Sequence, residues 1–249
     1  MRLTRSRTSI YDSLLSLIYP QACEICGASV ENSADGVACS NCWQQVTLFR
    51  PHDTVCWKCG APAHTHGSVP PENFRCRSCD QHMFTSARAC GVYEGALRAS
   101  VLQLKREPWV CQRLLDQLCQ LCLMAPLDRA TRIAAVPLHP MRQKERGFNQ
   151  AAVIAKSLAD LTHLPFYEQS LSRITDTIRH RAGMDARGRH ETVTNAFAVP
   201  HPLVVKDERI LLIDDVYTSG STASACADRL LNAGANEVLV LTLARPLKH

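Results

Sequence analysis

Apolar runs of two kinds alternate along the C-terminal part of the chain. Residues 210–213 are four consecutive aliphatic side chains, a pattern typical of a buried parallel strand, and residues 133–138 form a second apolar run of strand length. Residues 109–124, 151–161 and 223–231 place their apolar positions at helical spacing, which predicts helices. Strands that alternate with helices predict an α/β domain with a parallel sheet.

Acidic and small polar residues directly follow the run at 210–213. Asp214 and Asp215 come first, and a short loop then leads into the helix predicted at 223–231: Thr218, Ser219, Gly220, Ser221 and Thr222. Carboxylates accept hydrogen bonds from adjacent sugar hydroxyls, whereas N–H groups at a helix N-terminus bind phosphate. The stretch therefore predicts a site for a ribose phosphate. The plainer interpretation is an ordinary polar turn between a strand and a helix.

This stretch resembles the signature of type I phosphoribosyltransferases, in which two acids precede the loop that holds phosphoribosyl pyrophosphate (PRPP). The resemblance implies that Asp214 and Asp215 hold the ribose as the catalytic pair, and that residues 218–222 hold the 5-phosphate. It also implies that Mg²⁺ accompanies PRPP and neutralises the pyrophosphate.

A basic segment follows the apolar run at 133–138. Arg142, Lys144 and Arg146 lie two residues apart in what the sequence predicts to be a proline-stiffened loop. From a loop after a strand, these side chains could face the pyrophosphate of PRPP. A solvated, charged turn is the other interpretation.

Eight of the 13 cysteines form four C-x2-C pairs in the N-terminal part of the chain: Cys23 and Cys26, Cys39 and Cys42, Cys56 and Cys59, and Cys76 and Cys79. Each pair offers two thiolates, so two pairs complete a tetrahedral Zn²⁺ site, and the eight thiols predict two structural zinc ions. Disulfides are the weaker interpretation, because we expect a cytoplasmic protein, in which thiols stay reduced.

The order of these pairs also bears on how they are grouped. The pattern C-x2-C-G followed by C-x2-C occurs twice in succession, which favours two sequential ribbons. An interleaved arrangement, in which the first pair joins the third, stays open because spacing alone does not exclude it.

Net charge and hydropathy each limit the functions that the sequence can support. The formal net charge of the 249 residues is +5. Two four-thiolate zinc sites would add about −4 and leave about +1, so overall basicity is no argument for nucleic acid. No apolar run approaches the ~18 residues of a membrane span, which predicts that the protein is not an integral membrane protein.

The most basic local segment lies between Arg173 and Phe197. It could close over pyrophosphate or follow the backbone of single-stranded DNA, and a solvated loop is the third interpretation. His180 is the candidate for a general base. The candidates for nucleic-acid contacts are Arg179, Arg181, Arg187 and Arg189.

Together, several of these features resemble the ComF/GntX family. They are the four C-x2-C pairs, the Asp-Asp loop, Val136-Pro-Leu, and Arg146-Gly-Phe-Asn-Gln150. The resemblance implies a double zinc ribbon at 20–86 and a phosphoribosyltransferase-like domain at 87–249, and the residue pattern before them predicts a short amphipathic segment at 1–19. One departure is Thr177-Ile-Arg-His180, which stands where the family has Thr-x-x-Gln.

The family resemblance also implies a role in DNA uptake and natural transformation. The protein would handle single-stranded DNA. A separate hypothesis is a structural zinc module that recruits a competence helicase or another uptake-machinery protein. The alternative is an orphan phosphoribosyltransferase that transfers ribose 5-phosphate from PRPP to an unknown nitrogen acceptor. Whether the chain is an enzyme stays open, since the sequence identifies neither the acceptor nor the general base.

Overall fold

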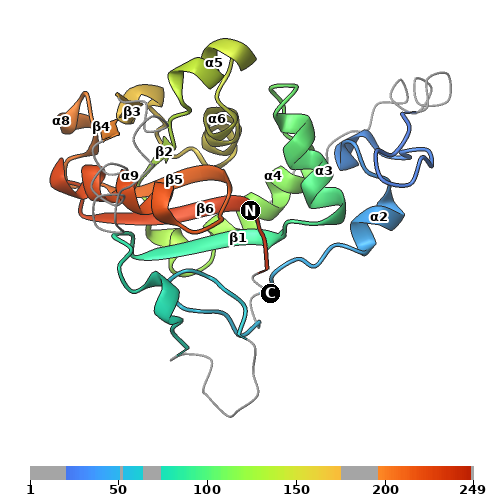
Figure 1. Ribbon diagram of the computed structural model, residues 1–249, viewed down its shortest axis with the longest axis horizontal. Coiled ribbons are helices and arrows are strands. Elements are labelled where there is room, and N and C mark those ends of the chain that lie inside the picture. The colour runs from blue at the N-terminus through green and yellow to red at the C-terminus, as the bar shows by residue number, and fades with distance from the viewer. Residues whose placement is uncertain (1–20, 51–52, 64–73, 175–195, 248–249) are drawn as a thin grey trace, which may run out of the picture.

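The centre of the protein is a parallel sheet. The computed structural model describes residues 21–50, 53–63, 74–174 and 196–247. Four strands run parallel in the order β1-β6-β5-β2 (Figure 1): β1 (Ser86–Val92), β6 (Glu237–Arg245), β5 (Arg209–Val216) and β2 (Arg132–Ala135). Residues 210–213 of β5 are fully buried, as expected for a central strand covered on both faces.

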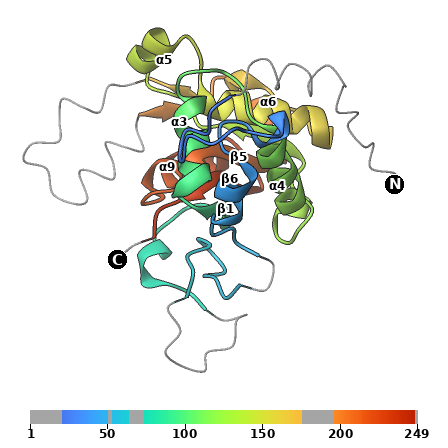
Figure 2. The same ribbon diagram turned by 90° about the vertical axis from the view of Figure 1, so that its right-hand side faces the viewer.

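Helices cover both faces of this sheet. They are α3 (Gly95–Leu104), α4 (Gln112–Cys122), α6 (Gln150–Thr162) and α9 (Ser221–Asn232). Figure 2 shows α4 and α6 on one side of the strands and α3 and α9 on the other. The predicted α/β class, a parallel sheet flanked by helices, is therefore confirmed.

The predicted elements agree with the observed ones except at two places after β2. The helices predicted at 109–124, 151–161 and 223–231 correspond to α4, α6 and α9, and the run at 210–213 lies in β5. The strand predicted at 133–138 ends earlier, at Ala135. Pro137 has no N–H to donate to a sheet ladder, which accounts for the early end.

The basic loop predicted after this strand is wrong, because its centre is a short helix, α5 (Pro140–Arg146). Nδ1 of His139 accepts a hydrogen bond from the N–H of Met141 at 3.2 Å and caps the helix N-terminus. Pro140 occupies the first turn, where its missing N–H costs nothing, and Gly147 ends the helix in the left-handed region at φ 80°.

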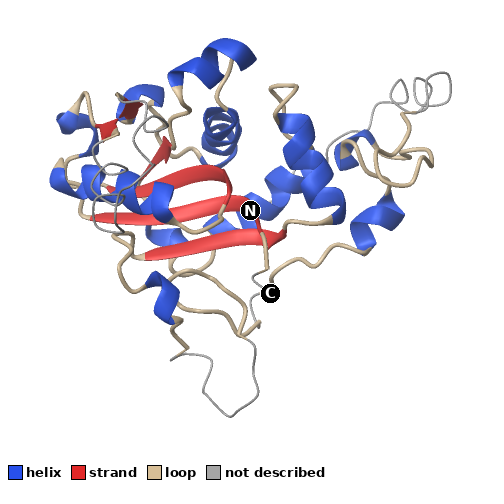
Figure 3. Ribbon diagram, in the orientation of Figure 1, coloured by secondary structure: helices blue, strands red, loops and turns tan. Residues whose placement is uncertain are grey.

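Both cysteine-rich ribbons are mostly loop (Figure 3). The first contains η1 (Ser33–Asp35) and α2 (Ser40–Gln44) and contacts α3 and α4. The second contains η3 (Arg77–Cys79) and leads into β1. The remaining short elements are η4 (Leu127–Arg129), η5 (Glu168–Ser170), β3 (Ser172–Arg173), β4 (Phe197–Ala198) and α8 (Pro202–Val205), of which β3 and β4 pair antiparallel.

Two expectations concern membranes and the N-terminus. Within the described ranges, no helix combines the length and the apolar character needed to cross a membrane. The amphipathic segment predicted at 1–19 lies outside the described residues and stays a prediction.

The parallel order of the strands determines where a site can form. The carboxyl ends of parallel strands meet at one edge of a sheet, which is where α/β proteins bind ligands. Here that edge collects Tyr93 after β1, Val136 after β2, Asp214 and Asp215 at the end of β5, and Pro246 after β6.

Candidate functional site

The eight paired cysteines form two separate clusters. Within each cluster the ligand sulfurs lie within 4.8 Å of one another: Cys23, Cys26, Cys39 and Cys42 in the first, and Cys56, Cys59, Cys76 and Cys79 in the second. The sequential grouping is therefore confirmed, and the interleaved alternative is wrong.

The sulfur separations fit a tetrahedral metal ion. A zinc ion with Zn–S bonds of about 2.3 Å needs S···S edges of about 3.8 Å. The Sγ atoms of Cys23 and Cys42 are 3.8 Å apart, and those of Cys56 and Cys79 are 3.6 Å apart. These distances are far from the ~2.05 Å of a disulfide.

Pairs of serine substitutions test this grouping by zinc content. Cys23→Ser with Cys39→Ser removes two ligands from one cluster, so one zinc ion per chain should remain. Cys23→Ser with Cys56→Ser damages both clusters, so both ions should be lost on dialysis. Elemental analysis of the purified variants gives the count, and the opposite result for the two pairs would mean that the ligands are interleaved.

The second candidate site is a cleft of about 520 Å³ at the carboxyl edge of the sheet. Asp214, Asp215, Thr218 and Thr222 are among the residues that line it. The Asp214 carboxylate accepts a hydrogen bond from the N–H of Asp215 at 2.9 Å, and the Asp215 carboxylate accepts one from the N–H of Val216 at 2.7 Å. These bonds hold the two side chains next to each other.

The two acids do not share one environment. Burial, together with the charge of Asp215, raises the pKa of Asp214 well above its usual range. On the other side, Nζ of Lys105 lies 3.9 Å from Oδ2 of Asp215. A buried carboxyl of this kind is stabilised by hydroxyl donors or by a cation, both of which a ribose phosphate with Mg²⁺ would bring.

The loop at residues 217–222, called here the phosphate loop, leads from β5 into α9. Gly220 is the N-cap of α9 at φ 79° and has no side chain with which to cap it. The N–H of Ser221 donates to Oγ of Ser219 at 3.3 Å, and an anion can bind the other N–H groups of the first turn, to which the N-cap residue offers no side chain. Ser219 and Ser221 are exposed, and their hydroxyls are 2.9 Å apart. The predicted loop residues are thus together, with the two threonines facing the cleft and the two serines at the surface.

The helix α5 separates the three predicted pyrophosphate ligands. Arg142 and Arg146 are one helical turn apart and both line the cleft, whereas Lys144 is exposed and is not among the lining residues. A loop could have aimed all three side chains at one ligand, but residues two apart on a helix face different ways.

Four cleft residues were not among the candidate PRPP ligands, although Arg173 belongs to the basic segment that could close over pyrophosphate. Lys105 follows α3, Arg173 lies in β3, Tyr93 follows β1, and Gln150 begins α6. The Gln150 side chain is 3% exposed, and among the described residues its Nε2 has no hydrogen-bond partner. Three of the four stand in family-like motifs, which are Tyr93-Glu-Gly95, Leu104-Lys105 and Arg146-Gly-Phe-Asn-Gln150.

The predicted nucleic-acid residues Arg179, Arg181, Arg187 and Arg189 lie outside the described residues, as does the candidate base His180. They stay predictions.

Comparison with known proteins gives four matches. The family model for a double zinc ribbon domain matches residues 14–73. The chain is 33% identical to the DNA utilization protein YhgH of Salmonella typhimurium over 93% of this chain and 100% of that protein. It is 28% identical to competence protein F of Haemophilus influenzae over 90% and 96%. Among solved structures, glutamine PRPP amidotransferase from B. subtilis is 19% identical and overlaps 59% of this chain and 26% of that chain, with a TM-score of only 0.38.

Proposed function

This chain belongs to the ComF/GntX family, and on that basis we propose that it binds PRPP in the cleft and handles single-stranded DNA during DNA uptake. The observation that supports PRPP binding is that three kinds of protein group, each suited to one part of PRPP, line the same cleft. The acid pair suits ribose hydroxyls, the N-terminus of α9 suits a 5-phosphate, and the basic side chains suit a pyrophosphate.

Charge supports a polyanionic ligand. The cleft is lined by four cationic side chains, Lys105, Arg142, Arg146 and Arg173, against the two carboxyls of Asp214 and Asp215. Since ionisation of Asp214 is disfavoured, the cleft is net positive. A concave surface with one dominant sign concentrates ligands of the opposite sign.

The acid pair also fits Mg²⁺ as a companion of PRPP. Proteins hold Mg²⁺ through oxygen atoms, commonly one or two carboxylates together with the phosphates of the substrate. Asp214 and Asp215 offer such oxygens in the lining of the cleft. The ion would supply charge neutralisation at the pyrophosphate.

Calorimetric titration with PRPP tests this part of the proposal. Wild-type protein should bind one PRPP per chain in the presence of Mg²⁺ and bind it more weakly without the ion. The variant with both Asp214→Asn and Asp215→Asn should not bind. Equal affinity in wild type and variant would refute the assignment of the ribose site.

Arg146→Ala should lower PRPP affinity about tenfold, because it removes a charged hydrogen-bond donor from the cleft wall. Lys144→Ala is the matched control, since it removes the same charge from an exposed position on the same helix. Its affinity should stay within about twofold of wild type at ordinary salt. Equal losses in the two variants would indicate that only overall charge matters.

The second part of the proposal concerns DNA. It is supported by the printed names of the relatives, a DNA utilization protein and a competence protein, and by the arginine-rich segment in the sequence. Basic side chains that follow a nucleic-acid backbone release bound counterions, so the affinity falls steeply with salt.

Fluorescence anisotropy with labelled single-stranded DNA tests it. The double variant Arg187→Ala, Arg189→Ala should bind more weakly, and its slope of log affinity against log salt should be smaller by about 1.4, at about 0.7 per phosphate contact. The control is Arg98→Ala with Lys156→Ala, two exposed charges on α3 and α6. Binding that is equal in both double variants would remove this segment as the DNA site.

The alternative is catalysis as an orphan phosphoribosyltransferase. A nitrogen acceptor would form a bond to C1 of the ribose while the bond from C1 to the pyrophosphate oxygen breaks, and pyrophosphate would leave with the electron pair. Release of pyrophosphate from PRPP in the presence of nucleobases, amines or cell metabolites would favour this alternative over binding alone.

A further inference from the structure

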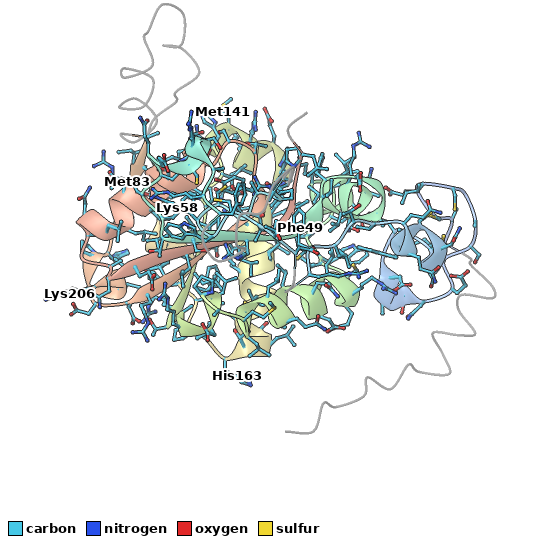
Figure 4. All side chains as sticks on the ribbon, turned by 90° about the horizontal axis from the view of Figure 1, so that it is seen from below. Phe49, Lys58, Met83, Met141, His163 and Lys206 are labelled. Atoms are coloured by element: carbon cyan, nitrogen blue, oxygen red, sulfur yellow. The ribbon has the colours of Figure 1, made fainter. Side chains whose placement is uncertain are left out.

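The segment that follows the last zinc ligand of the second ribbon lies against the phosphate loop. The N–H of Met83 donates to Oγ of Ser224, in the first turn of α9, at 3.0 Å. Nε2 of His82 lies 2.7 Å from the position that a Cβ on Gly220 would take. Nζ of Lys58, inside the Cys56–Cys59 knuckle, donates to the carbonyl oxygen of His82 at 2.7 Å. Figure 4 shows Lys58 and Met83 on the side of the sheet that carries α9.

Tyr217, the first residue of the phosphate loop, is tied to the same ribbon. The Arg245 guanidinium lies 4.9 Å from the centre of the Tyr217 ring, and its Nη1 donates to the carbonyl oxygen of Cys59 at 2.6 Å. Phe84 packs edge-on against Tyr217 at 6.2 Å between ring centres. Tyr217 and Arg245 are each 6% exposed, so these contacts are shielded from water.

The first ribbon is anchored elsewhere. Nε of Arg113, in α4, donates to Asp35 at 2.7 Å, and its guanidinium lies 5.5 Å from the Trp43 ring. Arg106, after α3, pairs with Glu24. Each ribbon therefore uses a buried or half-buried arginine that stacks on an aromatic ring, but these arginines attach the ribbons to different parts of the domain.

We propose that the second zinc ribbon holds the phosphate loop in its binding conformation, so that zinc in the second cluster sets phosphate affinity while zinc in the first does not. His82, Tyr217 and Arg245 are positioning residues in this scheme. The inference rests on the proposed function, because it takes residues 217–222 as the loop that binds the 5-phosphate of PRPP.

The physical reason is preorganisation. Backbone N–H groups bind phosphate well only if they are held in place before the ligand arrives, because ordering them on binding costs affinity. Zinc fixes the backbone at Cys59 and Cys79, and the contacts of Arg245 and His82 transfer that rigidity to the phosphate loop. Groups that support a site in this way commonly change affinity 10–100-fold when they are removed.

The first experiment compares one zinc ligand from each cluster in the full chain. Cys79→Ser should lose one zinc ion, bind PRPP about tenfold or more weakly, and show faster hydrogen exchange in peptides that cover residues 216–224. Cys42→Ser should also lose one ion but keep its PRPP affinity within about twofold of wild type, with unchanged exchange in the phosphate loop. Equal effects of the two variants on the loop would overturn the proposal.

A second pair of variants leaves all eight thiols in place. Arg245→Met keeps most of the side-chain volume but removes the donor to Cys59, so it should retain two zinc ions, speed up exchange at 216–224 and weaken PRPP binding about tenfold. Arg113→Met, the matched change in the first ribbon, should leave the loop and the affinity unchanged. Exchange in α6, on the opposite face of the sheet, should stay the same in every variant and serves as the check on folding.

Hydrogen exchange also separates this inference from the proposed function. If wild type does not bind PRPP, the proposed ligand is wrong, yet selective loosening of 216–224 would still support the link between the second cluster and the loop. If wild type binds PRPP and the two ribbons affect the loop equally, the site stands and the link is wrong.

Discussion

Replacement of Gly220 by alanine is expected to abolish PRPP binding while both zinc ions stay bound. Gly220 has a φ of 79°, in the left-handed region, and a Cβ there would lie 2.7 Å from Nε2 of His82 and closer still to Oη of Tyr217. The backbone strain costs about 1 kcal/mol. Relief of the clash must displace the buried tyrosine or the loop itself, so we expect PRPP affinity to fall about 100-fold or more.

Gly147→Ala is the matched control for this substitution. Gly147 has almost the same φ, 80°, but among the described residues nothing apart from its own chain neighbours lies within 4 Å of the added methyl group. Gly147→Ala should therefore lower the free energy of unfolding only by the cost of the left-handed backbone conformation, about 1 kcal/mol. Its PRPP affinity should stay within a few fold of wild type. Titration calorimetry and thermal melting measure both variants. If Gly220→Ala binds PRPP like Gly147→Ala, the phosphate is not held by the loop at the start of α9.

Asp214→Asn is expected to remove PRPP binding without any loss of stability. The carboxyl of Asp214 has a raised pKa because it is buried, with the charge of Asp215 as a further cause. Its ionisation therefore opposes folding at neutral pH, and the neutral amide removes that cost. We expect a melting temperature equal to that of wild type or higher, by about 2–4 °C for each 1 kcal/mol gained in a domain of this size.

The pH dependence of stability is a second, independent test of whether ionised Asp214 opposes folding. Because the folded pKa lies above the unfolded value, the folded state binds the extra proton, and stability falls as pH rises from about 4 through the folded pKa. In Asp214→Asn this contribution should disappear, whereas the control Asp228→Asn, outside the cleft on α9, should retain it. A variant that melts well below wild type at pH 7 would show that the Asp214 carboxylate is needed for the fold.

Local patterns predicted the parts of the protein whose geometry is set by neighbours in sequence. Four aliphatic residues followed by two acids and a glycine-containing loop specify β5, the phosphate loop and α9, because the apolar run needs burial in the sheet and the polar residues after it do not. The C-x2-C spacing likewise specifies each knuckle, since two thiolates three positions apart reach one metal ion. In α5 the same reasoning failed, because proline was taken to stiffen a loop, whereas Pro140 and Gly147 mark the start and end of a helix.

Contacts between segments far apart in sequence were decided by the tertiary structure alone. Spacing left the pairing of the knuckles open, and only the folded ribbons bring Cys23 to Cys42 and Cys56 to Cys79. Lys105, Gln150 and Arg173 come from the end of α3, the start of α6 and β3, and they meet at the carboxyl edge of the sheet only in the folded chain, which no local pattern encodes. The contact of the second ribbon with the phosphate loop has the same origin: residues 82 and 220 meet because β1, which follows the ribbon, pairs with β6 next to β5. Sequence alone therefore determined the chemical groups and their local shape, and the order of the strands determined which of these groups meet.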